Sequence, residues 1–86
     1  MKVCTLVFDY METLPMKATA VLIQKASVYK SSVWLTCGER RANAKSLLGV
    51  MSLDISQGAT IEVVTEGPDE EEALEDISNY LKSPTI

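Results

Sequence analysis

The sequence predicts an α+β fold in which three helices cover one face of a four-stranded antiparallel sheet, in the order β-α-β-β-α-β-α. Several short segments alternate between apolar and polar side chains, which is typical of strands with one solvated face. Between them, apolar residues recur at helical spacing and predict amphipathic helices. Such helices need an apolar surface to cover, and one face of the sheet supplies it.

The first part of the chain is predicted to form a strand and a helix. Residues 2–8 alternate and indicate the strand. Thr13 and Pro15 are typical of a helix start, because a hydroxyl can cap the first turn and proline suits that turn. Apolar residues then recur every three or four positions from Met16 to about Tyr29, which predicts the first helix.

The middle of the chain is predicted to form a hairpin followed by a short helix. Residues 33–37 and 40–44 read as two strands joined by a turn at Gly38. Ser46 can cap a helix of about two turns over residues 47–53, because its hydroxyl can accept a bond from a free backbone N–H. This helix is expected to be weak in isolation.

The last part of the chain is predicted to form a strand over residues 60–65 and a helix that begins after Gly67. Asp69 can cap this helix, and the three glutamates after it place negative charge where the helix dipole favours it. We interpret the acidic run as helix capping rather than a metal site. The apolar stripe of the helix consists of Ala73, Leu74, Ile77, Tyr80 and Leu81.

Composition limits the class of protein. A chain of 86 residues and 9.4 kDa, 47% of it apolar, is expected to form a single domain over residues 1–86. Its net charge of −4 argues against direct binding to nucleic acid or to an anionic membrane. No signal peptide or membrane span is recognisable, so we expect a cytoplasmic protein. Cys4 and Cys37 are too few for a disulfide framework or a zinc site, and no cofactor is expected.

Residues 43–53 carry the most specific pattern, N-A-K-S-L-L-G-V-M-S-L. This run resembles the regulatory-serine segment N-x-K-S-[IL]-[ML]-G-[VL]-M-S-L of the HPr family, which comprises the small phosphocarriers of the bacterial sugar phosphotransferase system and the paralogue Crh (catabolite repression HPr). Residues 58–74 are similar to a second family pattern, G-x-x-[VI]-x-[IL]-x-x-x-G-x-[DN]-E-x-x-A-[LI]. The resemblance covers about residues 5–82 and implies the HPr-like open-faced β-sandwich.

The phosphocarrier site of the family is degenerate in this sequence. The family has G-[LI]-H-A-R-P-A where residues 13–19 here read T-L-P-M-K-A-T. Pro15 thus takes the place of the phosphorylated histidine and Lys17 that of the arginine. Carrying the phosphoryl group on histidine requires a nucleophilic ring nitrogen, and this chain contains no histidine. The resemblance therefore implies a Crh-type regulatory paralogue, in which Lys17 either contacts a partner or phosphate or is a solvated surface lysine.

Ser46 is the candidate phosphorylation site. Alone it would be read as an ordinary helix cap, but the resemblance implies phosphorylation by an ATP-dependent HPr kinase/phosphorylase. The phosphorylated protein would then bind a repressor like catabolite control protein A. We expect partners to contact Lys45, Leu47, Leu48 and Met51, although burial of the three apolar residues in the core is an equal alternative. Arg40 and Arg41, with Lys45, lie near this serine in the sequence.

Two further interpretations remain open. The protein could be an unphosphorylated docking module of HPr fold, or a chain assigned to the phosphocarriers by similarity without phosphotransfer activity. An independent enzyme is not expected, because nothing in the sequence assembles a base, a nucleophile and an oxyanion site. A monomer is expected, with a weak strand-exchange dimer as the alternative.

Overall fold

The computed structural model describes residues 1–9 and 14–83. The elements are β1 (Lys2–Val7), α1 (Met16–Ser27), β2 (Ser32–Cys37), β3 (Arg40–Asn43), α2 (Leu47–Ser52), β4 (Thr60–Glu66) and α3 (Glu70–Lys82). The predicted order β-α-β-β-α-β-α is confirmed, with small shifts at the ends of the elements. The cap predicted at Thr13 lies outside the described residues.

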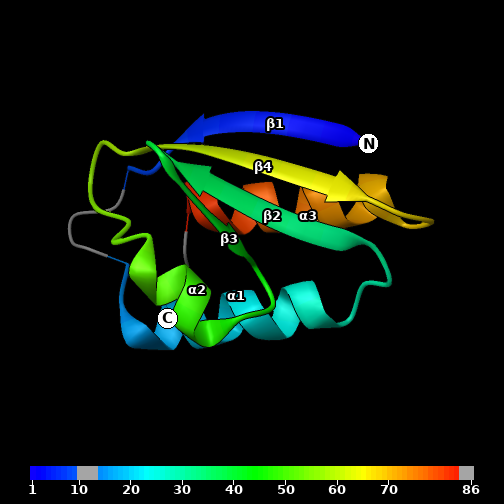
Figure 1. The fold of residues 1–86 in the computed structure, drawn as a ribbon, viewed down its shortest axis with the longest axis horizontal. Helices are drawn as coiled ribbons and strands as arrows, with labels where there is room; N and C mark the ends of the chain where they lie inside the picture. The colour runs from blue at the N-terminus through cyan, green and yellow to red at the C-terminus, as the bar shows by residue number, and fades with distance from the viewer. Residues whose placement is uncertain (10–13, 84–86) are drawn as a thin grey trace.

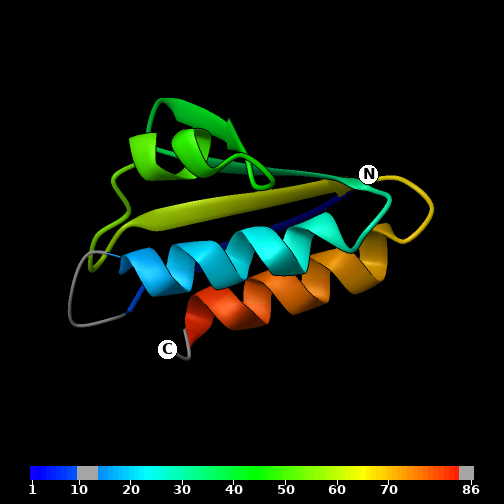
Figure 2. The same ribbon diagram turned by 90° about the horizontal axis from the view of Figure 1, so that it is seen from below.

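The four strands form one antiparallel sheet in the order β1-β4-β2-β3, as predicted (Figure 1). β4 and β2 lie in the centre, and β1 and β3 are the two edges. Helices α1 and α3 run side by side across one face of the sheet (Figure 2). The short helix α2 packs against β3 and α1.

The core lies between the sheet and the helices. Alternate residues of the strands face it, so Leu6, Cys4, Ile61 and Val63 are in register on the inner side of β1 and β4. The other face of the sheet carries polar and partly exposed side chains, as the alternation predicts. The fully buried side chains include Phe8, Leu22, Val33, Leu35, Ile55, Ile61, Val63, Ile77 and Leu81.

The role predicted for Asp69 is wrong in one respect. It occupies the N-cap position of α3 but makes no side-chain cap. Its carboxylate instead accepts hydrogen bonds from the backbone N–H groups of Lys30 and Ser31, both at 2.9 Å, and from the Ser31 hydroxyl at 2.5 Å. The side chain therefore ties the start of α3 to the segment before β2, because these stronger, charge-assisted bonds compete with capping.

Candidate functional site

Ser46 begins α2. Its backbone is extended (φ −107°, ψ 117°), and the backbone N–H of Gly49 donates to its Oγ at 3.2 Å. The backbone N–H of Val50 donates to the Ser46 carbonyl at 3.0 Å and closes the first turn. The predicted helix cap is therefore confirmed. The residue is exposed, so its hydroxyl is accessible from solvent.

One side of α2 anchors it to the domain. Val50 is only 2% exposed and belongs to the hydrophobic core. Gly49 faces Ala42 of β3 so closely that a Cβ added to the glycine would lie 3.3 Å from the Ala42 Cβ. The absence of a side chain at Gly49 thus lets this short helix pack directly on β3. Anchoring by tertiary contact compensates for the low intrinsic stability expected of six helical residues.

The other side of α2 is apolar and exposed. Leu47 is 44% exposed, Leu48 80% and Met51 47%. The alternative that these three residues form the core is therefore wrong, because Val50 alone turns inward. Met16, at the start of α1, is 57% exposed and adds a further apolar side chain. We call Met16, Leu47, Leu48 and Met51 the apolar surface.

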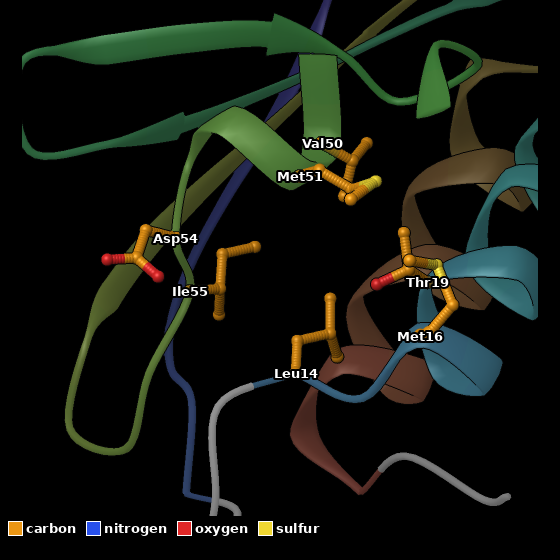
Figure 3. A pocket seen from close by; sticks show the side chains of 7 residues that line it. All are labelled: Leu14, Met16, Thr19, Val50, Met51, Asp54 and Ile55. Carbon is orange, nitrogen blue, oxygen red and sulfur yellow. The ribbon is translucent and has the colours of Figure 1, made fainter. Parts of the chain in front are cut away.

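A hollow of about 180 Å³ opens beside the apolar surface. Met16 and Thr19 of α1 lie on one side and Val50 and Met51 of α2 on the other (Figure 3). The remaining lining residues are Leu14, Asp54 and Ile55. The hollow is thus bounded by the loop before α1, by α1 itself and by the end of α2, which the sequence places far apart.

The backbone around the hollow is fixed by hydrogen bonds and by one unusual conformation. The N–H of Leu14 donates to the carbonyl of Ile55 at 2.9 Å and ties the two loops together. Asp54 has a φ of 52°, in the left-handed region that non-glycine residues seldom adopt. Aspartate tolerates this region better than most residues. This conformation ends α2 abruptly and turns the chain toward Ile55.

The degenerate phosphocarrier position lies next to the hollow. Pro15 is the N-cap of α1, and its carbonyl accepts hydrogen bonds from the Thr19 backbone N–H at 2.9 Å and the Thr19 hydroxyl at 3.1 Å. Pro15 offers no side-chain nucleophile there. Lys17 is exposed on the first turn of α1.

The sequence prediction missed Met16 as part of this surface. The helical spacing could have identified it. Met16 lies two residues before Ala18, so it falls outside the buried stripe of α1. That stripe contains Ala18, Thr19, Leu22 and Ala26.

The basic residues near Ser46 in sequence do not gather around it in space. The Lys45 ammonium donates to the carbonyl of Tyr29 at 2.9 Å. Arg40 donates to the carbonyl of Ser52 at 2.6 Å, at the far end of α2. Arg41 stacks on Trp34, 4.6 Å from the ring centre. Proximity in sequence thus does not bring these three charges together beside the serine; Arg40 and Arg41 diverge because neighbouring residues of a strand point to opposite faces.

Charge is nevertheless unevenly distributed along the chain. Residues 14–54 hold six basic and two acidic side chains, whereas residues 55–83 hold one basic and eight acidic ones. The apolar surface therefore comes from the basic part of the sequence, and the acidic side chains are concentrated in α3 and the segment before it.

The strongly shifted pKa values lie away from the apolar surface. The Ser31 hydroxyl and the Lys30 N–H lower the pKa of Asp69 to about 2. Tyr29 donates to the Asp76 carboxylate at 2.7 Å, and this bond, with burial, raises the pKa of the tyrosine to about 12. Both groups stabilise junctions between elements, so we assign them structural roles.

Within residues 1–9 and 14–83, no helix has the length and apolar character needed to cross a membrane. The same residues contain no cluster of histidine, cysteine or acidic side chains arranged to hold a metal ion.

The chain is similar to known proteins along nearly its whole length. The family model for the phosphorylation site of the PTS HPr component matches residues 5–83. The HPr-like protein Crh of Halalkalibacterium halodurans is 36% identical over 69 residues, which cover 80% of this chain and 82% of Crh. The crystal structure of HPr-C-His from Thermoanaerobacter tengcongensis matches with a TM-score of 0.90 at 35% identity. The matched region covers 96% of this chain and 93% of the HPr-C-His chain.

A further structural match is the crystal structure of Bacillus subtilis Crh, which is described as a dimer with a swapping domain. Its TM-score is 0.77 at 32% identity, covering 90% of this chain and 88% of that one.

Proposed function

Because the chain belongs to the HPr family, we propose that it is a regulatory protein of Crh type, controlled by phosphorylation of Ser46, and not a phosphocarrier. It acts in carbon catabolite regulation by binding other proteins and catalyses no reaction of its own. The observation that carries the proposal is the accessible Ser46 at the edge of the apolar surface, on a helix that Val50 holds in place.

The composition supports the loss of phosphocarrier activity. The chain has no histidine, and Pro15 has no nucleophilic atom to replace one. The two thiols are poor substitutes: Cys4 and Cys37 lie in β1 and β2, and no imidazole is available to activate them. Transfer of a phosphoryl group by the histidine mechanism is therefore not available to this protein.

Phosphorylation would change the surface and leave the fold intact. A phosphate at Ser46 adds roughly −1.5 to −2 charges and three acceptor oxygens. A negative group at a helix start stabilises the helix by only about 0.3–1 kcal/mol, which is too little to drive refolding. The switch therefore acts through what α2 can bind, since new negative charge appears beside the exposed Leu47.

The partners we propose follow from this site. An ATP-dependent HPr kinase/phosphorylase modifies the serine, and a repressor like catabolite control protein A binds the product. Contact involves Lys45, Leu47, Leu48 and Met51, and the exposed Met16 extends the same area. The repressor, and not this protein, contacts DNA. We place the protein in the cytoplasm, where both partners would act.

An intact-mass measurement tests the proposal. The purified protein is incubated with ATP and an HPr kinase/phosphorylase, beside Ser46→Ala and Ser52→Ala. Ser52 is the matched control, because it is also an exposed serine of α2. We expect one phosphate-sized gain in the wild type and in Ser52→Ala, and none in Ser46→Ala. A histidine-bearing HPr serves as the positive control for the kinase.

The opposite result has a definite meaning. If the control HPr is phosphorylated and this protein is not, the serine switch is refuted for that kinase. The exposed apolar surface would then support the alternative of a docking module that needs no modification. Calorimetry of the phosphorylated protein with the repressor completes the test, since a serine switch requires tighter binding after phosphorylation.

A further inference from the structure

A groove separate from the apolar surface runs between β1 and α3, at the opposite edge of the sheet from α2. It has a volume of about 280 Å³, and β1 contributes Lys2 and Cys4 to it. The lining residues of α3 recur every three or four positions and form one stripe along the helix. They are Glu71, Leu74, Glu75, Ser78, Asn79 and Lys82. The groove thus has charged side chains at both ends and an apolar middle.

Ser78, near the middle of this stripe, is a buried polar side chain without a partner. The residue is 4% exposed, and its hydroxyl has no hydrogen-bond partner among the described residues. A buried hydroxyl without a partner is costly, and native proteins seldom leave one unexplained. A ligand that brings a hydrogen-bonding group to this part of the groove would remove the cost.

The outer edge of β1 can accept another strand. Within the described residues β1 pairs only with β4, so alternate residues direct their N–H and C=O groups away from the sheet. The register from Lys2↔Thr65 to Val7↔Thr60 has no bulge, and the strand contains no proline. Edge strands without such protection readily pair with an added strand. Val3 and Val7 are 53% and 56% exposed, and the side chains of a neighbouring strand would cover them.

We propose that this groove and edge bind an extended segment of another protein, which joins the sheet as a fifth strand and places one large side chain in the groove. Pockets that hold a whole cofactor or small molecule usually enclose about 300–1,000 Å³. This groove is smaller and lies along a strand edge, so it fits one side chain of a longer segment. The inference does not depend on the function proposed for Ser46.

The charges of the groove determine which side chains the segment carries. Glu75 and Lys82 lie two turns apart on one side of α3, about 10 Å along its axis. Neither makes an ion pair within the described residues. The first and fifth residues of a strand point to the same face about 13 Å apart, and flexible charged side chains span the difference. The segment therefore carries a basic residue beside Glu75 and an acidic residue beside Lys82.

The third residue of the segment lies between these two charges, over the middle of the groove. Leu74 and Cys4 offer apolar contact there, and the Ser78 hydroxyl lacks a hydrogen-bond partner. Tyrosine matches both requirements, because its ring is apolar and its hydroxyl can donate and accept. The chain's own β1, K-V-C-T-L-V, has neither an aromatic residue nor an acidic one to meet Lys82. We therefore expect the segment to come from a different protein.

The direction of the segment follows from the pairing of strands. Lys2 of β1 forms an ion pair with Glu71 of α3 at 3.3 Å, so both elements begin at the same end of the groove. They also run in the same direction (Figure 1). A strand antiparallel to β1, the more stable arrangement, then runs from Lys82 toward Glu75. The segment therefore reads acidic-x-tyrosine-x-basic from its N-terminal end.

Fluorescence anisotropy with two labelled peptides tests the proposal on the full chain under reducing conditions. The peptides share polar flanks and have the central sequences E-V-Y-V-K and K-V-Y-V-E. We expect the first to bind about tenfold more tightly, because the second replaces two surface ion pairs by two repulsions. The combined variant Glu75→Lys with Lys82→Glu should reverse this preference. Glu72→Lys is the matched control, since Glu72 is also an exposed glutamate of α3 but does not line the groove.

Ser78→Ala tests the position of the tyrosine. The wild type should bind E-V-Y-V-K about fivefold more tightly than E-V-F-V-K, because one hydrogen bond is gained, and Ser78→Ala should bind both alike. Alanine removes an unpaired buried hydroxyl, so this variant should be at least as stable as the wild type and its weaker binding is not a consequence of unfolding.

Amide hydrogen exchange identifies the edge that the peptide occupies. We expect binding to slow exchange at the amides of β1 that face away from β4, and to leave those at the outer edge of β3 unchanged. The proposal would be overturned by no binding at any attainable concentration, by equal affinity for the two charge orders, or by protection of β3 instead of β1. A tyrosine preference that survives Ser78→Ala, or a second copy that occupies the edge and excludes the peptide, would also refute it.

Discussion

Two residues of α2 that are two positions apart should respond oppositely to truncation. Leu48 is 80% exposed and Val50 is 2% exposed. We therefore expect Val50→Ala to destabilise the protein with little direct effect on a docked partner. Leu48→Ala should leave stability unchanged and weaken docking. The pair separates the contribution of α2 to the core from its contribution to the apolar surface.

The expected magnitudes follow from burial. Val50→Ala removes two buried methylene equivalents, worth about 1.6 kcal/mol of transfer free energy. A residual cavity adds to this, but Val50 borders the hollow and solvent can relieve part of that cost. We expect a loss of about 2 kcal/mol. Leu48→Ala loses only about a fifth of the roughly 2.5 kcal/mol gained by fully burying a leucine side chain. The higher helix propensity of alanine offsets part of this loss.

Urea unfolding followed by circular dichroism measures the stability of both variants. Calorimetry of the Ser46-phosphorylated forms with the repressor measures docking, for which we expect Leu48→Ala to weaken binding about tenfold. If Leu48→Ala costs as much stability as Val50→Ala, the orientation of α2 is wrong. If its binding equals that of the wild type, the docking surface lies elsewhere on the molecule.

Three further predictions concern stability. The pKa of Asp69 is depressed, so its ionised carboxylate stabilises the folded state. This stabilisation is fully present above pH 4 and is lost as pH falls toward about 2. In Ser31→Ala, an acid titration of the unfolding free energy should show a weaker dependence, because the hydroxyl is lost while the backbone N–H groups of Lys30 and Ser31 remain as donors. The raised pKa of Tyr29 has the opposite effect on pH dependence. The neutral tyrosine stabilises the folded state below pH 10, and this stabilisation is lost as pH rises toward about 12. Tyrosinate absorbance, compared between the wild type and Tyr29→Phe, follows this ionisation. Gly67→Ala should lower the free energy of unfolding by at least about 2 kcal/mol, because φ is 148° and the added Cβ would lie 2.6 Å from the Ser31 Cα. Gly38→Ala is the control: its added Cβ meets no atom within 4 Å, so only the strain of its φ of 64° lowers stability.

The sheet and the long helices were predictable because their patterns are local. Alternation over residues 2–8 and 60–65 identifies strands with one covered face, and the structure confirms both segments. The stripe that contains Ile77 likewise identifies the buried side of α3. Each of these patterns repeats several times within its element. The side that faces the core is therefore specified without knowledge of the neighbours.

The orientation of α2 was not predictable in this way. Its residues L-L-G-V-M-S are almost all apolar, so no polar face indicates which side is exposed. The packing of Gly49 on Ala42 and the burial of Val50 decide it. This contact lies between α2 and a neighbouring strand, and periodicity within a six-residue helix cannot reveal it.

Long-range hydrogen bonds place two side chains that sequence rules could not place. Asp69 satisfies the sequence rule for a cap, but its carboxylate binds Ser31, which is 38 residues away. Lys45 is next to Ser46 in the chain, but its ammonium binds the carbonyl of Tyr29. The dispersal of Arg40 and Arg41, by contrast, was predictable, because adjacent strand residues point to opposite faces.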